Sequence, residues 1–161
     1  MIDAITELAP DFRTAYSSGG VILSVAVDDI AGAAVIYDKA AKKFPTDWQI
    51  AFKAAYHYLY EMGNKERAAE LMKVSAMNGG PYWLSMLAAK LYSRTGKALL
   101  GKAVLEDFLA KNPEKADNEA IKIRMAEIER DLAAGDDPEP TPAPESAAAA
   151  KQPTELPKKK Q

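Results

Sequence analysis

Cysteine is absent from this chain of 161 residues, and histidine occurs once, as His57. Without cysteine there is no disulfide framework, no thiol nucleophile and no thiolate metal site. A metal site built on His57 has only Glu61, four residues further along a helical pattern, as a second ligand on the same face, whereas zinc sites normally use three or four protein ligands. The sequence therefore predicts no catalytic residue, no bound metal and no cofactor.

Long apolar runs and an excess of one charge are also missing. The longest apolar run, residues 21–27, is interrupted by a serine and is far shorter than the roughly 20 residues that span a membrane. The first ten residues lack the basic segment and the hydrophobic core of a secretion signal. A net charge of −2 offers no basic footprint for nucleic acid. These absences predict no nucleic-acid partner. They leave the location open between the cytoplasm, which fits the visible sequence, and the envelope, if an anchor precedes this chain.

The composition of the chain changes at Gly135. The segment from there to the end, GDDPEPTPAPESAAAAKQPTELPKKKQ, holds six of the ten prolines and no aromatic residue. Such a segment cannot bury enough apolar surface to offset its ordering entropy. We therefore predict a helical domain over residues 1–134 and a disordered tail over residues 135–161. The tail is interpreted as a solubilising spacer or, alternatively, as a docking tail whose terminal lysines contact an acidic partner or a membrane surface.

Within the first zone, residue types recur with a period of about 34, which indicates a repeat architecture. Pairs of small residues return after 35 and then 34 positions, at Gly19–Gly20, Ala54–Ala55 and Ala88–Ala89. Turn residues follow eight positions after Gly20, Ala55 and Ala88, and they are Asp28, Gly63 and Gly96. A second set of small residues comes next, each with a large residue four positions later: Ala33 with Tyr37, Ala68 with Met72, Gly101 with Leu105. The units close at Pro10, Pro45, Gly80 and Pro113.

Each unit contains two helical patterns, and the middle unit shows them most clearly. Its apolar spacing predicts one helix over residues 48–62 and a second over residues 65–77. Gly63 and Asn64 form the stop and turn between the two helices. Asp47 is a favourable N-cap for the first helix, because its side chain can accept a hydrogen bond from the exposed backbone N–H groups.

This pattern resembles the tetratricopeptide repeat, a helix–turn–helix unit of 34 residues. The resemblance implies an all-α solenoid of about three units, with a half repeat at residues 1–10, repeats at 11–46, 47–80 and 81–113, and a capping helix at 114–134. Two residues depart from the family pattern: Gly19 stands where leucine is usual, and Phe108 stands where alanine is usual.

The glycine pair in the first unit calls for a physical reason, because each glycine inside a helix costs about 1 kcal/mol relative to alanine. We expect Gly19 and Gly20 to lie where the first and second helices cross, so that the two backbones approach closely. Leucine at position 20 is then expected to destabilise the domain strongly, whereas alanine there is expected to be mild.

The resemblance also implies a protein that binds other proteins without catalysis and without a small-molecule substrate. In stacked repeats the first helices line a concave groove. We expect a peptide or a partner helix to bind there, with positive charge from Lys53, Lys90 and Arg94 and apolar contacts from Tyr60 and Met86. The complete predicted set of groove residues is Lys53, His57, Tyr60, Met86, Lys90 and Arg94.

The N-terminal segment suggests an alternative. Ile2, Ile5 and Leu8 form an apolar stripe typical of the last turns of a second helix whose partner helix would precede Met1. This face predicts docking, as a structural subunit of a larger bacterial envelope or motility assembly. The chain is also similar to bacterial tetratricopeptide proteins that carry a membrane anchor upstream, which would make any membrane contact indirect.

Overall fold

The computed structural model describes residues 2–135, apart from the side chain of Asp3; Met1 and residues 136–161, on which the predicted tail falls, lie outside the described residues. Over the described range the chain is helical and contains no strand, which confirms the predicted all-α class. The helices are α1 (Ile2–Leu8), α2 (Arg13–Val21), α3 (Ile30–Lys43), α4 (Trp48–Tyr60), α5 (Lys65–Met77), α6 (Trp83–Ser93), α7 (Ala98–Lys111) and α8 (Glu119–Ala134).

Two short segments add to these helices. A π-helical turn, Ile22–Ala26, continues α2, and a 3-10 turn, Pro113–Lys115, precedes α8. In the middle unit, α5 matches the predicted range and α4 ends two residues earlier than predicted. The segment around the glycine pair is helical, as the repeat pattern requires.

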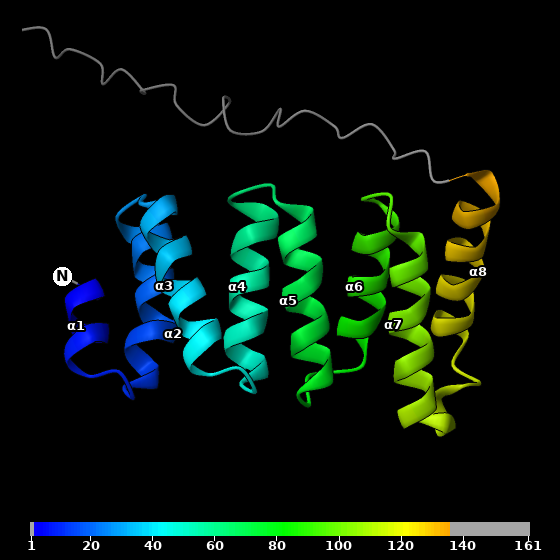
Figure 1. Ribbon diagram of the computed structural model, residues 1–161, viewed down its shortest axis with the longest axis horizontal. Helices are drawn as coiled ribbons and strands as arrows, with labels where there is room; N and C mark the ends of the chain where they lie inside the picture. Colours follow the sequence, from blue (N-terminus) through cyan, green and yellow to red (C-terminus); the bar gives the residue numbers. More distant parts are fainter. Residues whose placement is uncertain (1, 136–161) are drawn as a thin grey trace, which may run out of the picture.

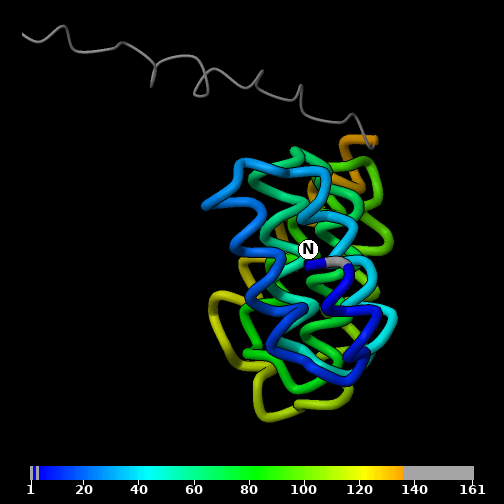
Figure 2. The backbone as a smooth tube through the Cα atoms, turned by 90° about the vertical axis from the view of Figure 1, so that its left-hand side faces the viewer, coloured from blue at the N-terminus to red at the C-terminus, as the bar shows by residue number. Residues whose placement is uncertain are grey.

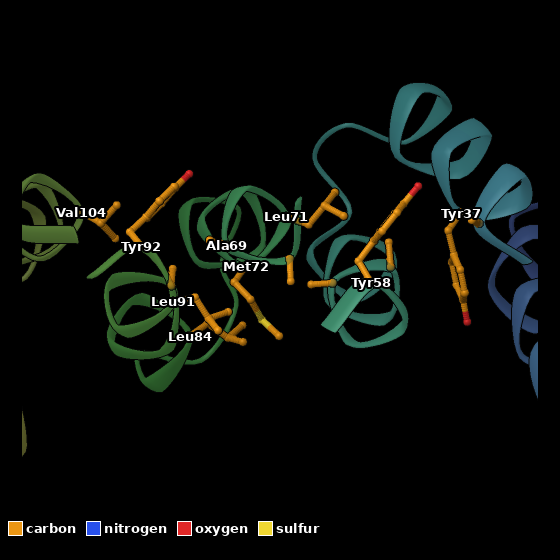
Figure 3. Packing of buried hydrophobic residues seen from close by; sticks show 14 of the residues in the cluster. Tyr37, Tyr58, Ala69, Leu71, Met72, Leu84, Leu91, Tyr92 and Val104 are labelled. Atoms are coloured by element: carbon orange, nitrogen blue, oxygen red, sulfur yellow. The ribbon is translucent and has the colours of Figure 1, made fainter. Parts of the chain in front are cut away.

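The helices stand in one row, and each packs against the next in the chain (Figure 1). Helix α8 also contacts α6, so the last three helices form a small group of their own. Figure 2 looks along this row from the α1 end. The largest hydrophobic cluster follows the row from α3 to α7, and Figure 3 shows its side chains spread from Tyr37 to Val104. The core is therefore elongated and is built from contacts between neighbouring helices.

Side-chain caps fix the starts of several helices. The Asp47 carboxylate accepts hydrogen bonds from the backbone N–H groups of Gln49 and Ile50, both at 3.1 Å, which confirms the predicted N-cap of α4. Asn64 caps α5 in the same way, through the N–H of Arg67 at 3.0 Å. Each such cap satisfies backbone donors that the first turn of a helix leaves unpaired.

The turn between the two helices of each unit has the same backbone conformation three times. Asp28, Gly63 and Gly96 have φ angles of 59°, 65° and 72°, in the left-handed region. Glycine adopts this region without strain, whereas aspartate is one of the few other residues that tolerate it. The sequence period of these turn residues is therefore also a period of the backbone.

Two of the glycines, Gly20 and Gly101, lie at close helix contacts, and the contact at Gly20 contradicts the expectation that alanine there is mild. A Cβ atom added at Gly20 would lie 2.5 Å from Cζ of Tyr37, whose ring on α3 is 4% exposed. At Gly101 on α7, an added Cβ would lie 2.7 Å from the backbone oxygen of Ala89 on α6. Alanine at position 20 therefore cannot be mild, because the buried ring of Tyr37 already occupies the space that its methyl group needs.

A polar network joins the first unit to the second. The Tyr58 hydroxyl on α4 donates to the Asp38 carboxylate on α3 at 2.7 Å, and Arg67 on α5 donates to the same carboxylate at 3.0 Å. Burial, and then the hydrogen bond to Asp38, raise the pKa of Tyr58 to about 12. The network therefore fixes three consecutive helices with partners that are all satisfied.

Candidate functional site

The first helices of the three units, α2, α4 and α6, share a set of solvent-facing positions. On α4 these positions hold Tyr56 and Tyr60, which are 51% and 64% exposed and whose rings lie 4.4 Å apart. Val21 and Val25 stand 35 residues before these tyrosines and are 41% and 79% exposed. Helix α6 and the turn after it place Lys90 and Arg94 at 34 residues beyond the tyrosines. We call this surface the first-helix face, and its residues are Val21, Val25, Gln49, Tyr56, Tyr60, Trp83, Lys90 and Arg94.

A hollow of about 400 Å³ lies where the N-terminal ends of these three helices meet. The rings of Phe52 and Trp83 form its aromatic part and contact each other edge to face, with centroids 5.6 Å apart. The lining comes from all three first helices and from the segment before α6: Arg13, Trp48, Gln49, Phe52, Lys53, Pro81 and Trp83. The hollow therefore shows that α2, α4 and α6 open onto one common surface.

Two cations at the hollow are held in place by protein groups. Arg13 donates to the Asp47 carboxylate and, at 2.7 Å, to the side-chain oxygen of Gln49. The hydrogen bond from Arg13 lowers the pKa of Asp47 below its ordinary value. Lys53 donates to the backbone oxygen of Ser17 at 3.2 Å, which links α4 to α2. The charge of Arg13 is therefore offset by Asp47, whereas Lys53 keeps its positive charge and is hydrogen-bonded to the backbone.

The predicted groove residues fall into two groups. Tyr60 and Arg94 are exposed, and Lys53, Met86 and Lys90 are partly exposed. Met86 packs against the cluster formed by α6, α7 and α8, so only part of its side chain faces outward. His57 is 3% exposed, its Nε2 lies 3.1 Å from the backbone oxygen of Ile30, and its ring lies beside Tyr37. The structure therefore places His57 in the interior, where it offers no surface to a partner.

The structure adds residues that the sequence did not assign to the surface. Tyr56 and Trp83 are 51% and 40% exposed, although aromatic residues on helices usually pack into a core. Gln49 and Arg13 also contribute to the hollow. The signal that identifies Tyr56 is its spacing, because Gln49, Tyr56 and Tyr60 recur at seven and four residues, which keeps them on one side of a helix.

The predicted N-terminal docking face is only partly exposed. Ile2 packs against the cluster of Tyr16, Ile36, Ala40 and Ile50 and lies over Gly19. Ile5 is 39% exposed and Leu8 is 87% exposed, and Phe12, at 53%, extends the same apolar end. Of the three predicted residues, Ile2 therefore faces the domain, whereas Ile5 and Leu8 face outward.

The described residues contain neither a cluster suited to a metal ion nor a helix suited to crossing a membrane. Within residues 2–135, no group of three or more histidine, aspartate or glutamate side chains is placed to hold a metal ion. In that range no helix combines the length and the apolar character that crossing a bilayer requires. No protein-family model, curated protein or solved structure matches this chain. Function is therefore inferred from the surfaces of the chain itself.

Proposed function

We propose that this protein is an α-solenoid of the tetratricopeptide type that binds a peptide or a partner helix on its first-helix face and performs no chemistry. The observation that carries this proposal is the exposed pair Tyr56 and Tyr60 on α4. The corresponding positions hold Val21 and Val25 in the unit before and Lys90 and Arg94 in the unit after. Exposed aromatic residues next to arginine are typical of binding hot spots.

The repeat assignment is supported by features that return in phase. The left-handed turn residues Asp28, Gly63 and Gly96 hold corresponding places. The small residues Ala33, Ala68 and Gly101 are buried at the helix crossings that follow those turns. Stacking of helix pairs with these two features is the arrangement that solenoid repeats use to present an extended binding surface.

The chemistry of the surface favours a partner segment with both apolar and acidic residues. The tyrosine pair and the aromatic hollow offer apolar contacts at the two ends of α4. Lys53, Lys90 and Arg94 supply positive charge along the same side. Charge complementarity of this kind increases association rates and selects among partners.

The experiment is a capture assay from native lysate with the full chain and paired variants. Tyr56→Ala combined with Tyr60→Ala is expected to reduce captured partner by tenfold or more, since hot-spot truncations cost about 1–2 kcal/mol or more each. The charge variant Lys53→Glu, Lys90→Glu, Arg94→Glu is expected to abolish capture.

A matched control removes two exposed apolar side chains from a second helix. Leu99 and Leu100 on α7 are 72% and 50% exposed, and changing both to alanine is expected to leave capture unchanged. Equal loss of partner in the leucine and tyrosine variants would remove the support for the first-helix face.

A second candidate function rests on a different observation. Leu8 and Phe12 present an apolar end at α1 that no described residue covers, which supports docking of this chain into a larger assembly through its N-terminal face. Leu8→Ser with Phe12→Ser is then expected to abolish co-purification of the assembly, while the tyrosine variants leave it intact. The opposite pattern supports the first-helix face instead.

A further inference from the structure

A second hollow, of about 250 Å³, lies between the C-terminal halves of α5 and α7 and shares no residue with the first-helix face. We propose that it binds small carboxylates with a compact aromatic or aliphatic body. This inference goes beyond the proposed function, because it assigns a ligand of a different class to a different part of the molecule.

The walls of this cavity combine apolar and polar residues, with the apolar part the larger. Met77 on α5 and Val104 and Phe108 on α7 line it, and the loop before α6 closes one side with Gly79 and Gly80. An added Cβ at Gly80 would lie 2.6 Å from the backbone oxygen of Ser75, so this wall has no room for a side chain.

The sequence departs from its own repeat at these positions. Gly79 stands 35 residues after Phe44, which packs edge to face on Tyr16 in the first unit. Phe108 stands at the position held by Ala40 and Ser75 in the earlier units. The loop before α6 thus has glycine where the loop before α4 has an aromatic residue, and α7 has an aromatic residue where α3 and α5 have a small one. The Phe108 side chain lines the cavity. The hollow is therefore a feature of this one unit.

Two polar groups in the cavity have no partner among the described residues. Ser85 on α6 is 3% exposed and lines the cavity, and no hydrogen bond joins its hydroxyl to another described residue. Lys73 on α5 also lines the cavity and forms no ion pair within residues 2–135. Lys111, the other cation of the lining, is bonded to Asp107 at 2.8 Å. The Ser85 hydroxyl is not one of the fully buried polar atoms that lack a partner; it is open to the cavity, where a ligand can accept its hydrogen bond.

The size and charge of the cavity define the ligand class. An apolar cavity of about 150 Å³ is enough to hold benzene, so 250 Å³ accommodates a phenyl ring or a short branched chain with a polar arm. The charged lining consists of the Asp107–Lys111 pair and the additional Lys73, which leaves one positive charge unbalanced. A carboxylate supplies both the negative charge for Lys73 and the acceptor for Ser85.

The test is an NMR titration of the full chain with 4-phenylbutyrate, with 4-phenylbutanol as the neutral analogue. Saturable shifts at Ser85, Val104 and Phe108 are expected with the carboxylate, and the alcohol is expected to bind about three- to fivefold more weakly, because a partly exposed charge pair contributes up to about 1 kcal/mol. Shifts that stay linear to millimolar concentrations, or that fall on other helices, would overturn the proposal.

Three variants separate the parts of the site. Lys73→Gln is expected to reduce carboxylate affinity three- to fivefold and to leave the alcohol unaffected, whereas the matched change Lys65→Gln, on the same helix but outside the cavity, is expected to change neither. Ala76→Leu, at the wall, is expected to abolish binding of both ligands while the folded NMR spectrum is kept. Unchanged binding in Ala76→Leu, or equal losses in the two lysine variants, contradicts the assignment.

Discussion

The helix pairs α2–α3 and α4–α5 occupy corresponding places in consecutive units, yet they achieve a close crossing with different residues. In the first pair, a glycine on α2 faces the buried ring of Tyr37 on α3. In the second pair, the corresponding positions hold Ala55 on α4 and Met72 on α5, which are 0% and 1% exposed. The first pair combines glycine with tyrosine at these positions, and the second combines alanine with methionine. The period therefore specifies a volume at the crossing and not a residue type.

The largest expected effect breaks the crossing of the first pair. Gly20→Leu is expected to lower the free energy of unfolding by about 3 kcal/mol or more, and Gly20→Ala by about 1–3 kcal/mol, because both overpack a filled core. In a Tyr37→Leu background the cost of Gly20→Ala is expected to fall to a few tenths of a kcal/mol, since the ring that blocks the methyl group is gone. Urea unfolding of the unchanged chain, Gly20→Ala, Tyr37→Leu and the double variant measures this coupling. Additive effects of the two changes would contradict the contact between residues 20 and 37.

The next effect concerns the network that joins the two pairs. The pKa of Tyr58 is raised from 10.0 to about 12 in the folded chain, so folding binds this proton more tightly and the resulting stability is present in full below pH 10. It is expected to be lost as the pH rises from 10 to 12. Unfolding midpoints across this range are expected to fall less steeply for Tyr58→Phe than for the unchanged chain.

A control keeps this second prediction specific. Burial also raises the pKa of Tyr37 and of Tyr92, so part of the decline is expected to remain in Tyr58→Phe. The exposed Tyr60, changed to phenylalanine, is expected to leave the pH dependence as it is. If both phenylalanine variants behave alike, the buried Tyr58 hydroxyl does not control the decline.

A smaller effect is expected at Ala55, where α4 crosses α5. Ala55→Gly is expected to cost about 1 kcal/mol, the usual difference in helix propensity, because the neighbouring helix already fits a methyl group there. Adding a methyl group at position 20 and removing one at position 55 are therefore both expected to lower the free energy of unfolding. The same unfolding assay measures both changes. A gain in stability on placing glycine at position 55 would show that the α4–α5 crossing is also overpacked.

The smallest effect is expected at Tyr56, an exposed residue of α4 that lies two positions before the buried Tyr58. Tyr56 is 51% exposed, whereas Tyr58, two residues later, is 7% exposed. Tyr56→Ser is expected to change the free energy of unfolding by less than about 0.5 kcal/mol, as surface substitutions usually do. A thermal melt of this variant checks the value, and a large loss would mean that Tyr56 packs against the domain.

The sequence predicted the positions of the helices more accurately than it predicted which residues are exposed on them. The range of α5 and the cap at Asp47 follow from local residue patterns, and the structure confirms them. The three turn residues predicted by the period share one left-handed backbone conformation. The assignment of His57 to the surface was wrong by a single position, because one residue rotates a side chain by about 100° around a helix. The apolar spacing alone did not distinguish His57 from Tyr56.

Features that depend on several helices could not be predicted locally. The contact of Gly20 with Tyr37 joins residues 17 positions apart, and the second hollow joins α5, α6 and α7 with the loop between α5 and α6. Ser85 and Lys73 are ordinary helix residues until the fold places them at one cavity. Such sites arise from how neighbouring units stack, which single-unit patterns do not encode.

The central claim is that three equivalent helices lie side by side and present one face, and the absence of cysteine permits a direct test. Spin labels are attached to paired cysteines introduced at Val21, Tyr56 and Lys90, and pulsed electron paramagnetic resonance measures the three distances. The account predicts similar distances for the pairs 21–56 and 56–90, and a distance for 21–90 close to their sum. A 21–90 distance no longer than the other two would contradict it.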